Sequence, residues 1–71
     1  MIKTDFNIRI NGEPFHCTQL MTVYDLVSYL GVDCDVNIIE YNHHILDLNK
    51  LKLVLLKESD EIEIITLVGG G

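Results

Sequence analysis

The sequence has few basic residues and no long apolar run, and each lack excludes a class of protein. Five Lys and Arg residues stand against eleven Asp and Glu, so the formal net charge is −6. Without a basic cluster to neutralise phosphates, the chain is not expected to bind nucleic acid. Its longest apolar run, residues 53–56, is far short of the roughly 20 residues needed to span a bilayer, so we expect no membrane span. The acidic surface suits a basic protein partner, or serves solubility alone.

Cysteine and alanine are scarce as well. Cys17 and Cys34 are the two cysteines, without a CxxC motif, and there is no alanine. We expect two reduced thiols, with a single bridge as the alternative. Reduced thiols suit a cytoplasmic protein. The lack of Ala beside many Ile, Leu and Asn indicates an AT-rich genome, bacterial or organellar, and an organelle-encoded chain would instead be expected in the plastid stroma.

Residues arranged for catalysis or metal binding are also missing. The chain has no glycine-rich nucleotide motif and no Ser/His/Asp constellation. Cys17 with His16 or His43 is a conceivable nucleophile and base, but alternation places Cys17 with Phe15 on the inward face, where a thiol is usually inert. His43 and His44 are turn neighbours that point apart, with no further ligand at zinc-site spacing. We therefore expect no enzyme, no metal and no intrinsic cofactor.

What the first half does contain is a hairpin followed by a helix. Apolar and polar residues alternate over 6–10, directly before Asn11-Gly12, the pair most typical of a type I′ turn. The returning strand covers residues 13–18, and Pro14 places it at a sheet edge because proline lacks an N–H.

The helix has both of its ends encoded. Thr22 as N-cap and Asp25 at the third helical position form a capping-box pattern. Gly31 suits the left-handed residue that ends a helix. An apolar stripe at helical spacing is expected to face the core: Val23, Leu26, Val27 and Leu30.

The second half predicts further strands. Residues 36–41 are apolar on both faces, which indicates an interior strand, and after a turn at 42–44 a short return strand begins with Ile45 and Leu46. Residues 47–52 are expected to form a loop or a single helical turn. Four leucines nearby are expected in the core: Leu51, Leu53, Leu55 and Leu56. A polar turn at 57–60 precedes the last strand.

These elements predict an α+β fold of ββαββ order, with a mixed sheet and one main helix packed on one face. The first and last strands are both strongly apolar, so we place them side by side in the centre of the sheet. This is the β-grasp, or ubiquitin-like, roll. A chain of 71 residues has room for one domain, which we assign to residues 1–68, with residues 69–71 as a flexible tail.

The strongest functional signal is the C-terminal end of the chain. A β-branched strand passes without a turn residue into Gly69, Gly70 and Gly71, and glycines without side chains can thread a narrow channel. The terminal carboxylate of Gly71 is ionised at neutral pH. It can attack the α-phosphate of ATP to give an electrophilic acyl-adenylate. A partner must bind that ATP with its Mg²⁺, because this chain has no nucleotide-binding motif.

Several longer motifs are distributed along nearly the full length of the chain. They are Arg9-Ile10-Asn11-Gly12-Glu13, Thr22-Val23-Tyr24-Asp25-Leu26, Ile39-Glu40-Tyr41-Asn42, Leu56-Lys57-Glu58-Ser59-Asp60-Glu61-Ile62-Glu63-Ile64 and Val68-Gly69-Gly70-Gly71. Together they resemble the ThiS family, the small β-grasp sulfur carriers of thiamine biosynthesis. A terminal Gly-Gly alone is shared by ubiquitin-like proteins in general. Ser59 departs from the family pattern, because many members have Gly in this turn.

The resemblance implies a set of partners. A ThiF-like E1-type enzyme would adenylate Gly71, a sulfur donor protein would supply the sulfur of a thiocarboxylate, and thiazole synthase would receive it. Gly69 and Gly70 would present the tail. The small subunit of molybdopterin synthase has the same tail chemistry and stays an alternative, although the short chain and the Val-Gly-Gly-Gly ending favour the thiamine branch. A ubiquitin-like modifier and a β-grasp interaction module with an idle tail are further alternatives.

Alternation in the last strand predicts which residues meet a partner. If every second residue from Ile62 to Val68 faces the helix, then Ile65 and Leu67 project from the opposite face of the sheet. We expect Ile65, Leu67 and the adjacent Val68 to bind partners. The alternative is that these apolar side chains are covered within the fold.

Overall fold

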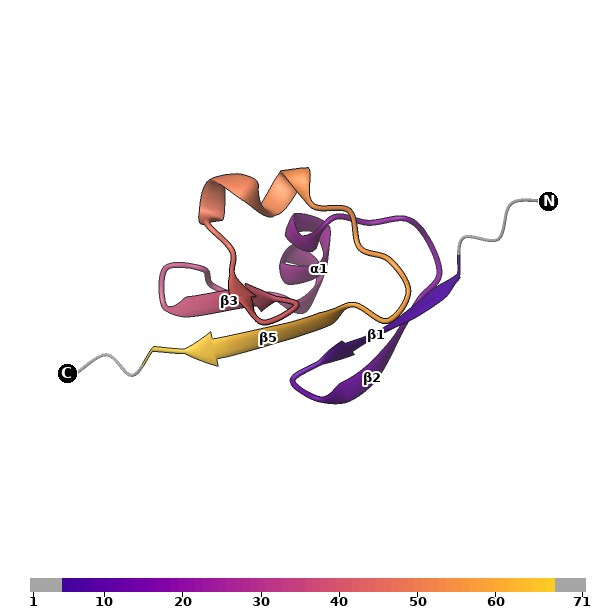
Figure 1. The fold of residues 1–71 in the computed structure, drawn as a ribbon. Coiled ribbons are helices and arrows are strands. Elements are labelled where there is room, and N and C mark those ends of the chain that lie inside the picture. The colour runs from indigo at the N-terminus through magenta and orange to yellow at the C-terminus, as the bar shows by residue number, and fades with distance from the viewer. Residues whose placement is uncertain (1–4, 68–71) are drawn as a thin grey trace.

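The strongly apolar strands lie where the sequence places them, in the middle of one mixed sheet. The computed structural model describes residues 5–67, and within them the chain forms five strands, one α-helix and one 3₁₀-helix. Their bounds are β1 Phe6–Ile10, β2 Glu13–Cys17, α1 Val23–Leu30, β3 Asn37–Tyr41, β4 His44–Ile45, η1 Leu48–Leu53 and β5 Glu61–Thr66. Figure 1 shows α1 and η1 on the same side of the sheet.

The strand order is β2-β1-β5-β3-β4. β5 runs parallel to β1 and antiparallel to β3, and both hairpins are antiparallel. The predicted β-grasp roll is therefore confirmed, with β1 and β5 adjacent and the Pro14-bearing strand β2 at an edge. The predicted boundary between a domain and a tail after residue 68 lies outside the described residues.

Both hairpins turn through left-handed residues. Asn11 and Gly12 have φ of 51° and 81°, as a type I′ turn requires. Asn42 and His43 have φ of 49° and 72° and join β3 to β4 in the same way. The second turn is thus one residue shorter than predicted: His44 belongs to β4, and Leu46 follows it.

The helix ends are as predicted. Thr22 Oγ1 accepts a hydrogen bond from the Asp25 N–H at 3.0 Å, and the Thr22 N–H donates to Asp25 Oδ2 at 2.9 Å. Gly31 is left-handed, with φ of 71°. The reciprocal capping bonds satisfy two donors at the start of α1 that have no partner within the helix.

The core lies between the sheet and the two helices. Its buried members come from every large element: Phe6, Ile8, Cys17, Val23, Leu26, Val27, Ile39, Leu51, Leu56 and Ile62. Three leucines predicted in the core are exposed instead: Leu30, Leu53 and Leu55.

Local geometry explains two of these errors. Residues two apart in a helix face different directions, so η1 buries Leu51 and leaves Leu53 78% exposed. Residues 54–56 are extended, with the Leu56 N–H donating to the Met21 carbonyl at 2.9 Å. Alternation then turns Leu55 outward while Leu56 is buried.

One buried carboxylate stands at the start of β5. Asp60 is 2% exposed and accepts bonds from the Tyr41 hydroxyl at 2.8 Å, Asn42 Nδ2 at 3.1 Å, the Lys57 N–H at 2.9 Å and Lys57 Nζ at 2.6 Å. Burial by itself raises the pKa of the Asp60 carboxyl, but these hydrogen bonds outweigh burial and lower that pKa below its usual value. The same contact, chiefly the hydrogen bond to Asp60, raises the pKa of Lys57.

Replacing Asp60 should therefore destabilise the protein in a pH-dependent way. Asp60→Asn leaves Lys57 without its anion, and we expect the free energy of unfolding at pH 7 to fall by about 2–3 kcal/mol. Because the folded-state pKa of Asp60 is lowered, its contribution is present above the unfolded-state pKa of about 3.9 and is lost as pH falls through the folded-state value. Urea denaturation of the wild-type chain and of Asp60→Asn from pH 7 to pH 2.5 should show that the difference between their free energies of unfolding becomes smaller below about pH 4. A difference that does not change with pH would contradict this role of Asp60.

Two turn asparagines tie β5 to both hairpins. Asn11 Oδ1 accepts from the Ile64 N–H at 2.7 Å, and Asn11 Nδ2 donates to the Ile64 carbonyl at 3.4 Å. Asn42 Oδ1 accepts from the Glu61 N–H at 2.8 Å. The paired register of β1 with β5 stops at Ile62, so the Asn11 carboxamide continues that edge for one more step.

Substitution can separate the role of Asn11 in the left-handed turn from its hydrogen bonds to Ile64. Asn11→Gly keeps the left-handed turn but removes both bonds to Ile64, and we expect a loss of about 1 kcal/mol of unfolding free energy in urea denaturation. His43→Gly is the matched control, since it also places glycine at a left-handed turn position and removes only an exposed contact with Glu61 at 3.8 Å. Equal stability of the two variants would argue against the tie.

Candidate functional site

The end of β5 carries the described part of the predicted site. Ile65 is 40% and Leu67 49% exposed, so the alternative that the fold covers them is excluded. Ile62 on the opposite face is buried, as predicted. Thr66 shares that inner face but is exposed. Val68, Gly69, Gly70 and Gly71 lie outside the described residues.

Neighbouring strands add apolar residues beside Ile65 and Leu67. Ile38 pairs with Ile65 across β3 and β5, and the Leu67 N–H donates to the Val36 carbonyl at 2.7 Å. Paired residues point to the same face of a sheet. Ile45 pairs with Glu40 and so shares this outer face. We call this set the outer patch: Val36, Ile38, Ile45, Ile65 and Leu67.

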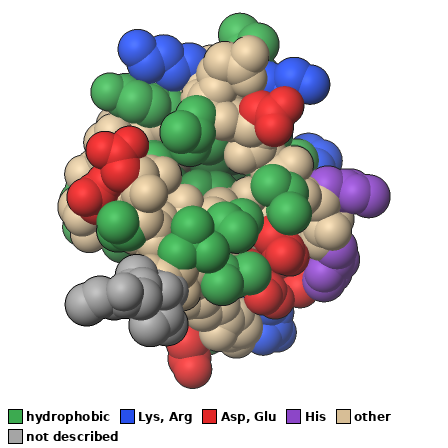
Figure 2. Space-filling view, turned by 90° about the vertical axis from the view of Figure 1, so that its left-hand side faces the viewer, with side chains coloured by type: hydrophobic (Ala, Val, Ile, Leu, Met, Phe, Trp, Pro, Cys, Tyr) green, Lys and Arg blue, Asp and Glu red, His purple; other side chains and the backbone are tan. Residues whose placement is uncertain are grey.

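Figure 2 views the molecule from the end where β5 finishes, and hydrophobic side chains gather there with acidic side chains beside them. A hollow of about 270 Å³ lies at this end, lined in part by Ile38, Ile45, Leu48 and Leu67. Contiguous exposed apolar residues around a hollow are typical of a protein contact surface.

An acidic pair borders the outer patch. Glu40 and Glu63 are directly opposite each other in the register of β3 and β5, and alternation places both on the outer face. Like charges in this arrangement are destabilising. Within residues 5–67, the ion pairs involve His16, His43 and Lys57, so neither glutamate is neutralised there. A basic group from another protein would relieve this repulsion.

The outer patch includes the last described residue before the glycine motif, Leu67. Four residues follow Leu67, and four residues span at most about 14 Å. The outer patch and the Gly69-Gly70-Gly71 motif are therefore neighbours along the chain.

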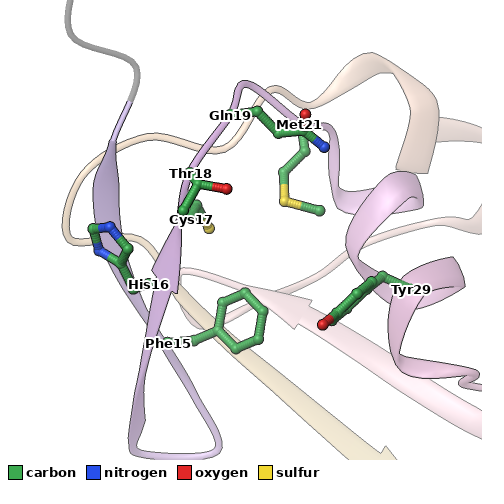
Figure 3. A pocket seen from close by; sticks show the side chains of 7 residues that line it. All are labelled: Phe15, His16, Cys17, Thr18, Gln19, Met21 and Tyr29. Carbon is green, nitrogen blue, oxygen red and sulfur yellow. The ribbon is translucent and has the colours of Figure 1, made fainter.

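The two cysteines lie in different places: Cys34 lines the hollow beside Leu67, and Cys17 lies away from it. Both thiols are free, as predicted. Cys17 lines a pocket between β2 and α1, where Figure 3 shows Phe15, Met21 and Tyr29 directed into the same space and His16 turned away. Burial raises the pKa of the Cys17 thiol, which disfavours the reactive thiolate.

The histidines do not form a catalytic or metal site with Cys17. His16 Nδ1 lies 2.8 Å from Asn7 Oδ1 on the other side of β2, and His43 belongs to the other hairpin. Among residues 5–67, no group of three His, Cys, Asp or Glu side chains is placed to hold a metal ion. No helix in this part of the chain is long and apolar enough to cross a membrane.

Comparison with known proteins agrees with this geometry. The model of the ThiS family matches residues 8–71, which includes the glycine tail. The chain belongs to the ThiS family. Its fold matches the crystal structure of the thiamine biosynthesis protein ThiS from Geobacter metallireducens with a TM-score of 0.80 and 26% identity, over 93% of this chain and 100% of that one.

Two further relatives extend the ThiS-family comparison. An uncharacterized protein ycf40 of Porphyra purpurea is 37% identical over 71 residues, the full length of both chains. A thiazole synthase of Paramagnetospirillum magneticum is 36% identical over 62 residues, which are 87% of this chain but 19% of that protein. In that relative, a ThiS-like segment is thus part of a longer chain named as thiazole synthase.

The structure shows why glycine is expected at the position that Ser59 occupies in this chain. Ser59 has φ of 70°, the left-handed region that favours glycine. Glycine is therefore expected at this turn because it adopts the left-handed backbone conformation without steric cost. Sequence reasoning missed Val36, Ile38 and Ile45 as members of the site, because only the strand register reveals that they lie beside Ile65 and Leu67.

Proposed function

We propose that this protein is a sulfur carrier for the thiazole moiety of thiamine, acting through its terminal carboxylate as a substrate of partner enzymes. The observation that carries the proposal is the family match, which runs through the β-grasp domain into the final glycine. The exposed end of β5 supports it, since the strand leads directly to that tail with an apolar contact surface beside it.

The chemistry belongs to the carboxylate of Gly71 and to partners. A ThiF-like E1-type enzyme binds ATP with Mg²⁺, and a carboxylate oxygen of Gly71 attacks the α-phosphorus with loss of pyrophosphate. A sulfide equivalent from a sulfur donor protein then adds to the acyl carbon and displaces AMP. The product is a thiocarboxylate, and Gly69 and Gly70 present it to thiazole synthase. This chain supplies the tail and its docking surface, without a cofactor of its own.

Thiazole synthase is favoured as the acceptor by the Paramagnetospirillum relative, in which a matching segment belongs to a protein of that name. The small subunit of molybdopterin synthase remains the alternative with the same tail chemistry. Purification of this protein from its source with bound thiazole synthase would support the thiamine branch. Recovery of a molybdopterin-synthase large subunit in its place would support the alternative.

The expected location of the protein is the cytoplasm, or the plastid stroma for an organelle-encoded chain.

The outer patch is the proposed docking surface for both the adenylating enzyme and the synthase. Its apolar centre fits an apolar partner surface, and Glu40 with Glu63 fits a basic side chain at the rim. Because Gly71 lies within about 14 Å of Leu67, each partner has to cover the same end of the sheet.

Thiocarboxylate formation gives the direct test of the function. Incubation with ATP, Mg²⁺, a ThiF-like enzyme and a sulfur donor should raise the intact mass by the difference between one sulfur and one oxygen atom. A variant lacking Gly70 and Gly71 should show no increase, because its terminal carboxylate falls short of the active site. A mass increase that survives this deletion would falsify the carrier mechanism.

Docking through the outer patch gives a second prediction. Leu67→Asp should weaken binding to the adenylating enzyme at least about 10-fold in calorimetric titration, because a charge would be buried at the apolar contact. Its melting temperature should change by less than about 4 °C, since exposed positions contribute little to stability. Leu53→Asp, an equally apolar exposed position on η1, is the control and should bind normally. Unfolding of Leu67→Asp, or equal weakening by both variants, would count against the patch.

A further inference from the structure

The last two described residues are held to the sheet from one side. Asn11 makes the final bonds on the β1 side, and these reach only Ile64. Beyond that point, the hydrogen bonds of Thr66 and Leu67 within residues 5–67 go to Asn37 and Val36. Thr66 Oγ1 donates to Asn37 Oδ1 at 2.8 Å, and the Leu67 N–H donates to the Val36 carbonyl at 2.7 Å.

Asn37 is itself fixed by a turn built around Asp33. Asn37 Nδ2 donates to the Asp33 carbonyl at 2.7 Å, and the Val36 N–H donates to the same carbonyl at 3.2 Å. The Asp35 N–H donates to Asp33 Oδ1 at 2.9 Å. The carboxamide of Asn37 thus joins this turn to the end of β5. Asn37 pairs with Thr66 on the inner face, and Asn37 also lines the hollow next to Leu67.

We propose that Asn37 is a positioning residue for the reaction at Gly71: together with Thr66 it clamps the point at which the tail leaves the sheet. The inference rests on the proposed carrier function. With the clamp in place, four residues separate the fixed Leu67 from the reacting carboxylate. Without it, the only hydrogen bond left beyond Ile65 within residues 5–67 is that of the Leu67 N–H to the Val36 carbonyl, and whenever this bond opens Thr66 and Leu67 have to be ordered again as the tail enters a partner's active site.

This geometry separates docking from tail insertion. Thr66 is not among the residues that line the hollow and does not belong to the outer patch, so Thr66→Val keeps every side chain of that surface, and the KM for this variant should stay within about twofold. Ordering an extra residue costs enough free energy to lower the rate of the bound complex about fivefold or more. The expected signature is therefore a fall in kcat at nearly constant KM.

The test compares Thr66→Val, Asn37→Ala and the control Thr66→Ser with the wild-type chain. Thr66→Val keeps the β-branched shape but removes the hydroxyl, while Thr66→Ser keeps the hydroxyl. Each protein is assayed with the ThiF-like enzyme by ATP–pyrophosphate exchange, varying the carrier concentration. In parallel, NMR hydrogen exchange of the Leu67 amide reports whether the end of β5 opens more often.

The expected result is that Thr66→Val and Asn37→Ala lower kcat about fivefold, with faster exchange at Leu67, while Thr66→Ser behaves as wild type. Unchanged kcat in both variants with faster exchange at Leu67 would overturn the clamp and leave the carrier function intact. A rise in KM without a fall in kcat would overturn it too, since the residues would then act in docking. Failure of the wild-type chain to support exchange would instead overturn the proposed function, and the clamp with it.

Discussion

The structure depends on the central strand of the sheet, β5, which is bonded along both edges. β5 runs parallel to β1 on one side and antiparallel to β3 on the other, so it joins two hairpins that are far apart in the sequence. The buried carboxylate of Asp60 holds the start of β5. Farther along the strand, Asn42 and Asn11 from the two turns accept hydrogen bonds from its backbone. The core residue Ile62 lies between these ties. Whatever displaces β5 would therefore disturb both hairpins and the core together.

The same strand leads from the interior of the fold to the surface, just before the glycine motif. Ile62 is buried, Ile64 is half-buried, and Thr66 and Leu67 are exposed. A strand that runs from the core to the surface in this way gives its last described residues a defined direction, which suits the carrier function proposed above. The two faces at this end then have different roles in our proposals. In these proposals the outer face binds partners, and on the inner face Asn37 and Thr66 hold the end of β5.

The local elements could be predicted because their causes are local. The Asn11-Gly12 turn, the capping box of Thr22 and Asp25 and the left-handed Gly31 each depend on a few adjacent residues. Errors arose where a period was misread or where burial depended on distant elements. The exposed Leu53 and Leu55 belong to a 3₁₀-helix and an extended segment, which orient side chains differently from the continuous core run that the leucine spacing suggested.

The sequence by itself determined the family, the β-grasp order of strands and helix, and the outward direction of Ile65 and Leu67. These follow from motifs, turn residues and alternation, all of which act over short distances along the chain. Only the tertiary structure decided which residues join them. Val36, Ile38 and Ile45 share the outer patch, and Asn37 reaches Thr66, because the register of β3 with β5 brings together segments separated by about thirty positions. Alternation within one strand assigns a face, but it does not specify the neighbour across the sheet.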